Sequence, residues 1–237
     1  MKFSFGIITS PKSSSYLKKV IKSIKKQNIP EDKYEIVVVG GNKEFNSNNI
    51  RNIDFNEEEK TGWITRKKNL ITLNANFENI VYIHDYIKLS KGWYKGFLEF
   101  GNDFEVCVNK ILNYDDTRYR DWTLWTSNEN ELDNVLSDVN SECLIPYEVT
   151  HLSKFMYISG AYWVAKKKLM ENFPLDENLA WGEGEDVEWS KRIRNQIEFK
   201  FNPYSQVKLL KYKPPIFSEP DKNKLKDILE KTNQILS

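Results

Sequence analysis

The sequence predicts an α/β fold, and three observations at its N-terminal end predict it. Residues 3–9 (FSFGIIT) are a short apolar run rich in β-forming side chains, which indicates a buried strand. An amphipathic stretch follows from Tyr16 to Ile24, and residues 35–39 (EIVVV) form a second apolar run. A strand–helix–strand unit implies a right-handed crossover between parallel strands. Ligands of such folds bind beyond the carboxyl ends of the strands, so we expect a site at Thr9, Ser10, Gly40 and Gly41.

The remaining elements of the first half alternate in the same way. Pro30 ends the first helix, whose apolar positions are Tyr16, Leu17, Val20, Ile21 and Ile24. Residues 42–60 are polar and predict a loop with a short strand near Ile53. We then expect a helix over residues 64–76, a strand over 79–83 that ends at His84-Asp85-Tyr86, and the start of another strand at 105–108.

The second half is less regular. Residues 113–148 are polar and aromatic without periodicity, and a stretch that long is usually functional in a compact domain. We expect substrate recognition there, by Arg118, Tyr119, Arg120, Asp121, Trp122 and Trp125. An apolar run at 155–164, a short helix at 166–172, an acidic turn at 181–186, a helix at 187–194 and a C-terminal helix (Leu225, Ile228, Leu229, Thr232, Leu236) complete the predicted elements.

Composition and charge exclude several classes of protein. The 237 residues carry 35 basic and 34 acidic side chains, a net charge of +1, which argues against a dedicated nucleic-acid binder. The N-terminus has no signal-peptide core, and no stretch approaches the roughly 20 apolar residues of a membrane span. We therefore expect a cytoplasmic protein with at most peripheral membrane contact. Cys107 and Cys143 fit a pair or a reducing compartment, and their spacing does not match a metal site.

Asp85 is the first residue that suggests chemistry. It follows an apolar strand, so its carboxylate faces the expected ligand crevice, where a divalent ion can neutralise a diphosphate. A purely structural role, in which Asp85 caps the next turn, remains equally open. Arg66, Lys68 and Asn69 lie on the preceding helix, where the basic side chains either meet a diphosphate or form a solvated face.

The acidic turn Trp181-Gly182-Glu183-Gly184-Glu185-Asp186 is the second such feature. Glycines let the backbone approach a ligand closely, and a carboxylate at a helix start can accept a proton from an attacking hydroxyl. Acids are favoured in a first helical turn for structural reasons as well. Capping needs one acid, however, whereas four acids lie between Glu183 and Glu188, and capping does not explain Trp181 beside two glycines, so a functional role is favoured.

Taken in order, these motifs resemble the inverting GT-A glycosyltransferases, of the broad family 2 kind and its galactosyltransferase-like relatives. The resemblance spans roughly residues 3–200 and includes Gly160-Ala161-Tyr162-Trp163 as well as the acidic turn. It implies a GT-A, Rossmann-like fold: a mixed, mostly parallel central sheet flanked by helices. It further implies a single domain over 1–237, with a nucleotide-sugar-binding half (1–110) and an acceptor-binding, catalytic half with the C-terminal helix (111–237).

The resemblance also implies an activity and residue roles. The activity is inverting transfer of a sugar from a nucleotide-sugar donor to a glycan, lipid-linked or other hydroxyl acceptor, in glycan or polysaccharide synthesis. Asp186 matches the catalytic base, and Asp85 matches the family's metal site for Mn²⁺ or Mg²⁺. The implied acceptor-binding residues are Trp181, Gly184 and Glu185, and the implied donor-binding residues are Thr9, Ser10, Gly40, Gly41, Arg66, Lys68, Asn69, His84 and Asp85.

Departures from the family pattern leave alternatives open. His84 and Tyr86 replace the acids that usually accompany Asp85, and no histidine follows Asp186. Either Asp85, with His84, holds an ion, or lysines such as Lys208 and Lys211 replace it. A GT-A domain that binds a sugar nucleotide or glycan without catalysis is one rival function. A nucleotidyltransferase is another, although residues 10–15 lack the glycine-rich loop expected for it.

Overall fold

A computed structural model describes residues 1–11, 14–41, 45, 47–125, 142–214, 226, 229 and 230. Within these residues the central sheet has eight strands in the order β3-β2-β1-β4-β10-β6-β11-β5. The strands are β1 (Phe3–Ile8), β2 (Tyr34–Val39), β3 (Ile50–Ile53), β4 (Asn79–His84), β5 (Ile87–Leu89), β6 (Val106–Leu112), β10 (Tyr162–Lys166) and β11 (Phe199–Leu209).

The sheet is mixed and mostly parallel, which confirms the predicted fold class. β1 pairs in parallel with β2 on one side and β4 on the other, so Ile8 lies between Val39 and His84. The chain order therefore reverses between β1 and β4, and a reversal of this kind opens a crevice at the strand ends. β10 runs antiparallel between β4 and β6, and β5 runs antiparallel at the edge beside β11.

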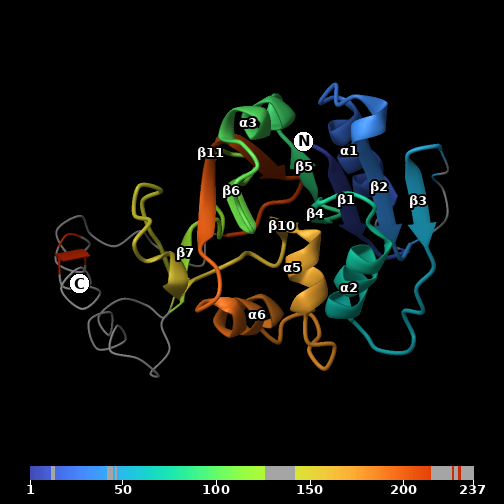
Figure 1. The fold of residues 1–237 in the computed structure, drawn as a ribbon. Coiled ribbons are helices and arrows are strands. Elements are labelled where there is room, and N and C mark those ends of the chain that lie inside the picture. The colour runs from blue at the N-terminus through green and yellow to red at the C-terminus, as the bar shows by residue number, and fades with distance from the viewer. Residues whose placement is uncertain are drawn as a thin grey trace.

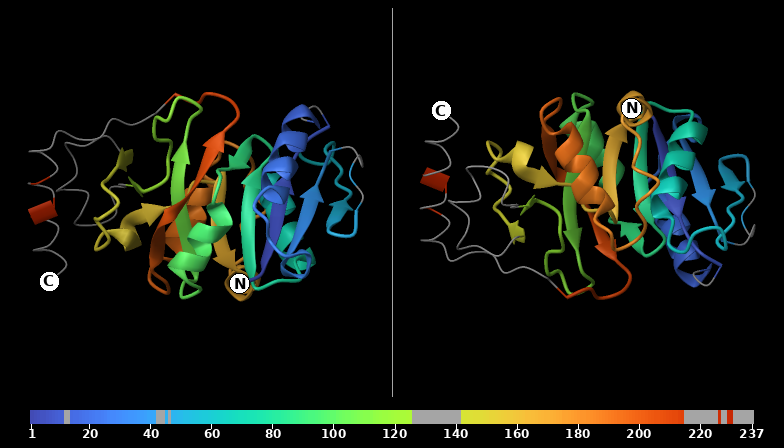
Figure 2. Two further views of the ribbon diagram at one scale, coloured as in Figure 1. Left: turned by 90° about the horizontal axis from the view of Figure 1, so that it is seen from above. Right: turned by 90° about the horizontal axis from the view of Figure 1, so that it is seen from below.

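Helices cover both faces of the sheet (Figures 1 and 2). α1 (Ser14–Lys25) and α3 (Trp93–Phe100) lie on one face, and α2 (Ile64–Asn74), α5 (Lys167–Asn172) and α6 (Glu185–Ile193) lie on the other. Successive strand side chains alternate between the two faces. In β4, for example, Val81 packs in the α1–α3 core, whereas Ile80 and Tyr82 pack in the α2–α5–α6 core.

A second sheet extends the core on the α6 side. It pairs β8 (Glu142–Leu144), β7 (Thr123–Trp125) and β9 (Met156–Tyr157). The 3₁₀ turn η2 (Ser153–Phe155) leads directly into β9, and a second 3₁₀ turn, η1 (Glu31–Lys33), precedes β2. Trp122 is buried and donates its ring N–H to the Val149 carbonyl, 2.9 Å away. Trp122 therefore belongs to the core here, while residues 126–141 of the predicted recognition stretch lie outside the described residues.

Several element boundaries differ from the prediction. The apolar run at 155–164 is divided into β9 and β10 by a loop, and α6 begins at Glu185 rather than 187 because Gly184 precedes it with φ +75°. α3, β5 and β11 were not predicted. β11 contains Pro203, and a bulge between Asn202 and Gln206 lets it pair with β6 on both sides of that residue.

Three further expectations depend on particular residues. Cys107 is buried and free, so it does not form the disulfide that the sequence left open. The predicted C-terminal helix falls outside the described residues apart from 226, 229 and 230. Among the helices of the described part of the chain, none is both long and apolar enough to span a bilayer.

Candidate active site

A cavity of about 920 Å³ opens at the end of β4. Its walls come from the β9–β10 loop, the acidic turn with the start of α6, and two segments near residues 119–120 and 213–214. The lining residues are Ile64, His84, Tyr86, Tyr119, Arg120, Tyr157, Ser159, Gly160, Ala161, Trp181, Gly182, Glu183, Gly184, Glu185, Asp186, Val187, Glu188, Lys191, Lys213 and Pro214. The cavity thus gathers the whole acidic turn beside the strand-end His84.

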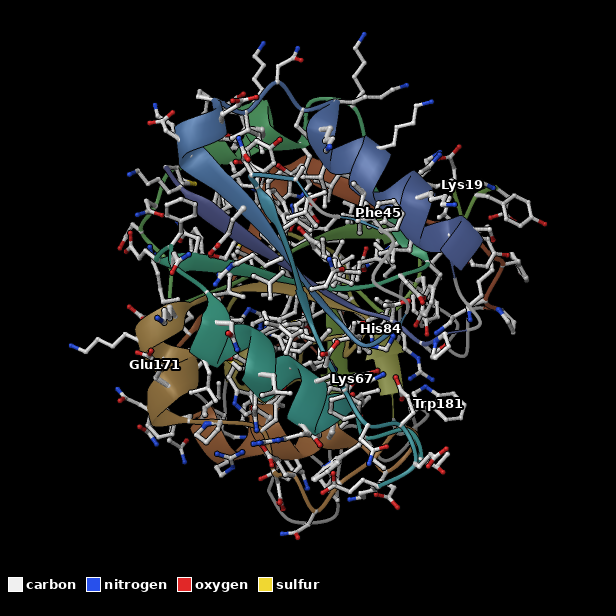
Figure 3. The ribbon with its side chains drawn as sticks, turned by 90° about the vertical axis from the view of Figure 1, so that its right-hand side faces the viewer. Lys19, Phe45, Lys67, His84, Glu171 and Trp181 are labelled. Atoms are coloured by element: carbon white, nitrogen blue, oxygen red, sulfur yellow. The ribbon has the colours of Figure 1, made fainter. Side chains whose placement is uncertain are left out.

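The acidic turn presents an aromatic face and two carboxylates to this cavity. Trp181 is 71% exposed, and its backbone N–H donates to the Gly62 carbonyl at 2.9 Å. In Figure 3, Trp181, Lys67 and His84 appear toward one end of the molecule, and Glu171 appears toward the other. Glu185 and Asp186 lie in the first turn of α6, where the helix dipole favours negative charge.

Asp186 is held by two backbone donors. Its Oδ2 accepts the Gly160 N–H at 2.7 Å, and its Oδ1 accepts the Val187 N–H at 3.0 Å. Burial, followed by the negative charge of Glu185, raises the pKa of Asp186 above its usual value, and the Gly160 N–H opposes that shift. The arrangement is a fixed carboxylate in a cavity wall with increased basicity, which suits proton abstraction.

Glu185 is paired with a buried lysine from α2. Lys68 is 1% exposed, its Nζ lies 3.1 Å from Glu185 Oε1, and it also lies 4.7 Å from the centre of the Trp163 ring. The sequence placed Lys68 among the donor-binding residues, and this role stays a prediction. In the structure Lys68 instead contacts the acidic turn, 117 residues later in the chain.

Arg66 and Asn69 hold the loop that leads to the acidic turn. Arg66 pairs with Glu177 at 3.1 Å, and Asn69 Nδ2 donates to the same carboxylate at 2.9 Å. Asn69 also donates to the carbonyl of Leu175 and accepts its N–H. Their predicted donor contacts remain untested, whereas their contacts in the structure position the 175–186 segment.

The other predicted donor-binding residues meet at the ends of β1, β2 and β4. Thr9 Oγ1 donates to Asp85 Oδ2 at 2.7 Å, and its second contact is to the Ser10 carbonyl at 3.4 Å. A Cβ on Gly40 would lie 2.5 Å from the Thr9 carbonyl, and one on Gly41 would lie 2.8 Å from Thr9 Cγ2. With φ angles of +84° and +74°, both positions require glycine. The structure therefore brings these five residues together as the sequence predicted.

His84 joins the strand ends to the cavity. Its Nε2 is buried and has no hydrogen-bond partner among the residues that the structure describes. Burial, followed by the positive charges of Lys68, Lys213 and Lys211, holds the pKa of His84 well below its usual value. The imidazole is therefore neutral at physiological pH.

The side chains that the structure describes do not by themselves form a site for a divalent ion. No group of three or more His, Cys, Asp or Glu side chains within the described ranges is arranged to hold a metal. Asp85 Oδ2 already accepts a hydrogen bond from the Thr9 hydroxyl, and the lysine charges around His84 oppose the binding of a further cation. The metal-binding role of Asp85 thus remains a prediction without support from the donor set.

A group of cations lies at the same strand end, and the sequence alone does not connect its members. Arg120, Lys211 and Lys213 surround Tyr86 and Tyr119, with Lys213 Nζ 2.8 Å from the Tyr86 hydroxyl. Arg120 and Lys211 were named separately, and Lys213 was not singled out. The available signal was the Lys-Tyr-Lys run before Pro214-Pro215.

Comparison with known proteins identifies the fold. No protein-family model and no curated protein matches the sequence. Several solved structures do match. S. aureus TarS 1–349 in complex with UDP has a TM-score of 0.58 and 16% identity over 88% of this chain and 61% of that chain, and its complex with UDP-GlcNAc has a TM-score of 0.59 and 16% identity over 90% and 60%. GalNAc-T7 with UDP, GalNAc and Mn²⁺ has a TM-score of 0.62 and 14% identity over 98% of this chain and 48% of that chain.

These neighbours are GT-A glycosyltransferases. At identities of 14–16% the likeness shows the fold, and the predicted GT-A fold is confirmed. The chain spans less than two thirds of the length of each of these neighbours.

Proposed function

We propose that this chain, which has the GT-A fold, is a glycosyltransferase that moves a sugar from a nucleotide-sugar donor to an acceptor hydroxyl with inversion, in glycan or polysaccharide synthesis. The observation that carries the proposal is Asp186: a half-buried carboxylate of raised pKa, fixed by the Gly160 N–H in the wall of a large cavity. Carboxylates of raised pKa that line a cavity are typical of catalytic bases.

The reaction is a single in-line displacement. The acceptor oxygen attacks the anomeric carbon, its proton passes to Asp186, and the bond from that carbon to the diphosphate oxygen breaks. The nucleoside diphosphate leaves with the bonding electron pair, and the configuration inverts. Because the two backbone donors fix the carboxylate before substrate arrives, little reorganisation is needed for proton transfer.

The acceptor is proposed to bind against Trp181. Its ring is 71% exposed at the cavity, and sugar C–H faces pack well on aromatic rings. Glu185, fixed by Lys68, adds a hydrogen-bond acceptor beside Asp186, and Gly184 lets the backbone approach the ligand. Glycans and lipid-linked acceptors both fit this chemistry.

The donor is proposed to be a uridine diphosphate sugar that extends from the strand ends into the cavity. Thr9, Ser10, Gly40 and Gly41 form the crevice between β1 and β2, where a nucleotide is expected in a sheet whose strand order reverses. The UDP, UDP-GlcNAc and GalNAc complexes of the neighbouring structures support this choice of donor.

One observation favours a rival function. His84 and Tyr86 stand beside Asp85 in place of acids, and no metal-ligand group was found in the described part of the chain, which suits a domain that binds a sugar nucleotide without catalysis. The intact Glu185-Asp186 pair argues against this rival, and a transfer assay separates the two.

The Asp186→Asn variant tests the proposal. We expect it to bind the donor as the wild type does and to lose about 10²–10⁴-fold in transfer rate, because the proton acceptor is gone. Glu171→Gln, an exposed change on α5, is the control and should transfer normally. Nuclear magnetic resonance of the product then reports the anomeric configuration. Near-normal transfer by Asp186→Asn, or retention of configuration, would contradict the mechanism.

A further inference from the structure

We propose that Arg120, Lys211 and Lys213 bind the diphosphate of the donor and stabilise the departing nucleoside diphosphate in place of a divalent metal ion. This inference rests on the proposed function. It assigns to protein side chains the charge neutralisation that a metal would otherwise supply at this site.

The three cations converge on two tyrosines beside the end of β4. Lys211 Nζ lies 4.1 Å and Lys213 Nζ 4.5 Å from the centre of the Tyr86 ring, and Lys213 Nζ lies 5.3 Å from that of Tyr119. Arg120 Cζ lies 5.9 Å from the Tyr119 ring. Aromatic faces attract cations and let like charges gather. Arg120 and Lys213 line the same cavity as Asp186.

The position of Lys213 is built into the fold. The fully buried Asn113 accepts the Lys213 N–H and donates to its carbonyl, each at 2.9 Å. The Tyr86 carbonyl accepts the Leu210 N–H at 2.7 Å, and the Tyr86 hydroxyl accepts a hydrogen bond from the Lys213 ammonium at 2.8 Å. The segment after β11 is therefore fastened both to the end of β4 and to the turn at Asn113. A solvated surface lysine has no such framework.

Two members of this group, Lys211 and Lys213, carry charges that no carboxylate of the described residues balances. Among those residues, no carboxylate lies within ion-pair distance of Lys211 or Lys213, whereas Lys208 pairs with Asp116 at 2.5 Å. Burial, then Lys211 and Arg120, lower the pKa of Lys213 to about 8. A diphosphate would compensate these positive charges through charge-assisted hydrogen bonds, whereas a divalent cation would add to their repulsion.

The geometry also explains the unusual strand end. Tyr86 follows the strand-end Asp85, and its ring and hydroxyl contact two lysines. An acid at that position would neutralise the cluster, and the tyrosine hydroxyl does not, because burial raises its pKa well above the usual range. Tyr86 thus holds the cation cluster in place without cancelling its charge.

Calorimetric titration with UDP tests the inference. Wild-type protein is titrated in EDTA and again with Mn²⁺, beside Lys211→Met, Lys213→Met and the control Lys200→Met, a β11 residue that pairs with Asp103. Thermal melting verifies that each variant is folded. We expect UDP to bind in EDTA with an affinity that Mn²⁺ changes less than about twofold. Each of the two site variants should weaken binding about tenfold or more, as expected for loss of a hydrogen bond to a charged group, and Lys200→Met should not. UMP lacks the second phosphate, so the affinities of the wild type and Lys213→Met for UMP should differ less than their affinities for UDP.

Two outcomes would overturn the inference and leave the proposed function intact: UDP binding that requires Mn²⁺, or folded Lys211→Met and Lys213→Met proteins that bind UDP as the wild type does. Absence of binding by UDP, GDP, CDP and dTDP, with and without Mn²⁺, would overturn both. Normal transfer by Asp186→Asn together with metal-free UDP binding would remove the mechanism and keep the inference.

Discussion

At the scale of single residues, Gly160 matters as much as the acids that it supports. A Cβ at this position would lie 2.6 Å from Glu185 Oε1 and 2.9 Å from Asp186 Oδ2, so the backbone is in contact with both carboxylates. The sequence contained this glycine within an apolar run, but its neighbours come from a helix that starts 25 residues later. Only glycine lets the N–H reach Asp186 here.

Gly160→Ala is therefore expected to lower kcat by about 10²-fold while the protein still folds, because displacing a catalytic group by about 1 Å has an effect of that order. Transfer rates and thermal melting would be measured together. The control is Gly101→Ala, where φ is +91° and nothing lies within 4 Å of the added Cβ. That variant should lose about 1–3 kcal/mol of stability, because only glycine adopts this backbone conformation readily, and keep its activity. Equal activity in the two variants would contradict the role of Gly160.

The titration of Lys213 gives a pH dependence. The groups that face it are Tyr86, Tyr119, Lys211 and Arg120, and its pKa is about 8 in the free protein. Diphosphate favours the charged ammonium, so UDP affinity should be highest below pH 8 and fall as the pH rises through that value. Lys213→Arg stays charged, so its UDP affinity should change less between pH 7 and 9. The titration of UDP itself affects both proteins equally. Parallel profiles would argue against this role of Lys213.

At the scale of elements, the contact between α2 and α6 joins the two halves of the site. Lys68 from α2 pairs with Glu185 in the first turn of α6, and its positive charge lowers the pKa of the neighbouring Asp186. α2 thus does two things for α6: it compensates a buried negative charge and it limits how far the basicity of Asp186 rises.

Lys68→Met should move the acidic limb of the kcat/KM profile to higher pH, since Asp186 loses a charge that favours its ionised form. It should also destabilise the fold by about 3–5 kcal/mol, because Glu185 is left buried and unpaired. The double variant Lys68→Met/Glu185→Gln should recover stability. An acidic limb that does not move in folded Lys68→Met protein would contradict this coupling.

At the scale of the whole molecule, the two halves of the sequence share one sheet. β10, from the second half, lies between β4 and β6, and β6 (Val106–Leu112) crosses the boundary expected near residue 110. We expect the full chain to unfold in one cooperative transition and a fragment of residues 1–110 not to fold, since its β4 edge would lose β10. Circular dichroism of both during heating checks this, and a sharp melting transition in the fragment would contradict it.

The sequence by itself determined the elements whose pattern is local. Local patterns of a few residues define the apolar runs of β1, β2 and β4, the helical spacing of α1 and the glycine-rich acidic turn. These elements can therefore be predicted without knowledge of the fold. For the same reason the strand-end group of Thr9, Gly40 and Asp85 was foreseeable, because parallel strands bring their carboxyl ends to one edge of the sheet.

Only the tertiary structure decided which side chains meet. Lys68 and Glu185 are 117 positions apart, and Tyr86 and Lys213 are 127 apart. Such pairs depend on strand order, register and the packing of helices on the sheet, which no local pattern encodes. β11 is the clearest case. Pro203 hides its strand pattern, yet the bulged pairing of β11 with β6 places Lys213 at the cavity and Lys211 at the Tyr86 ring.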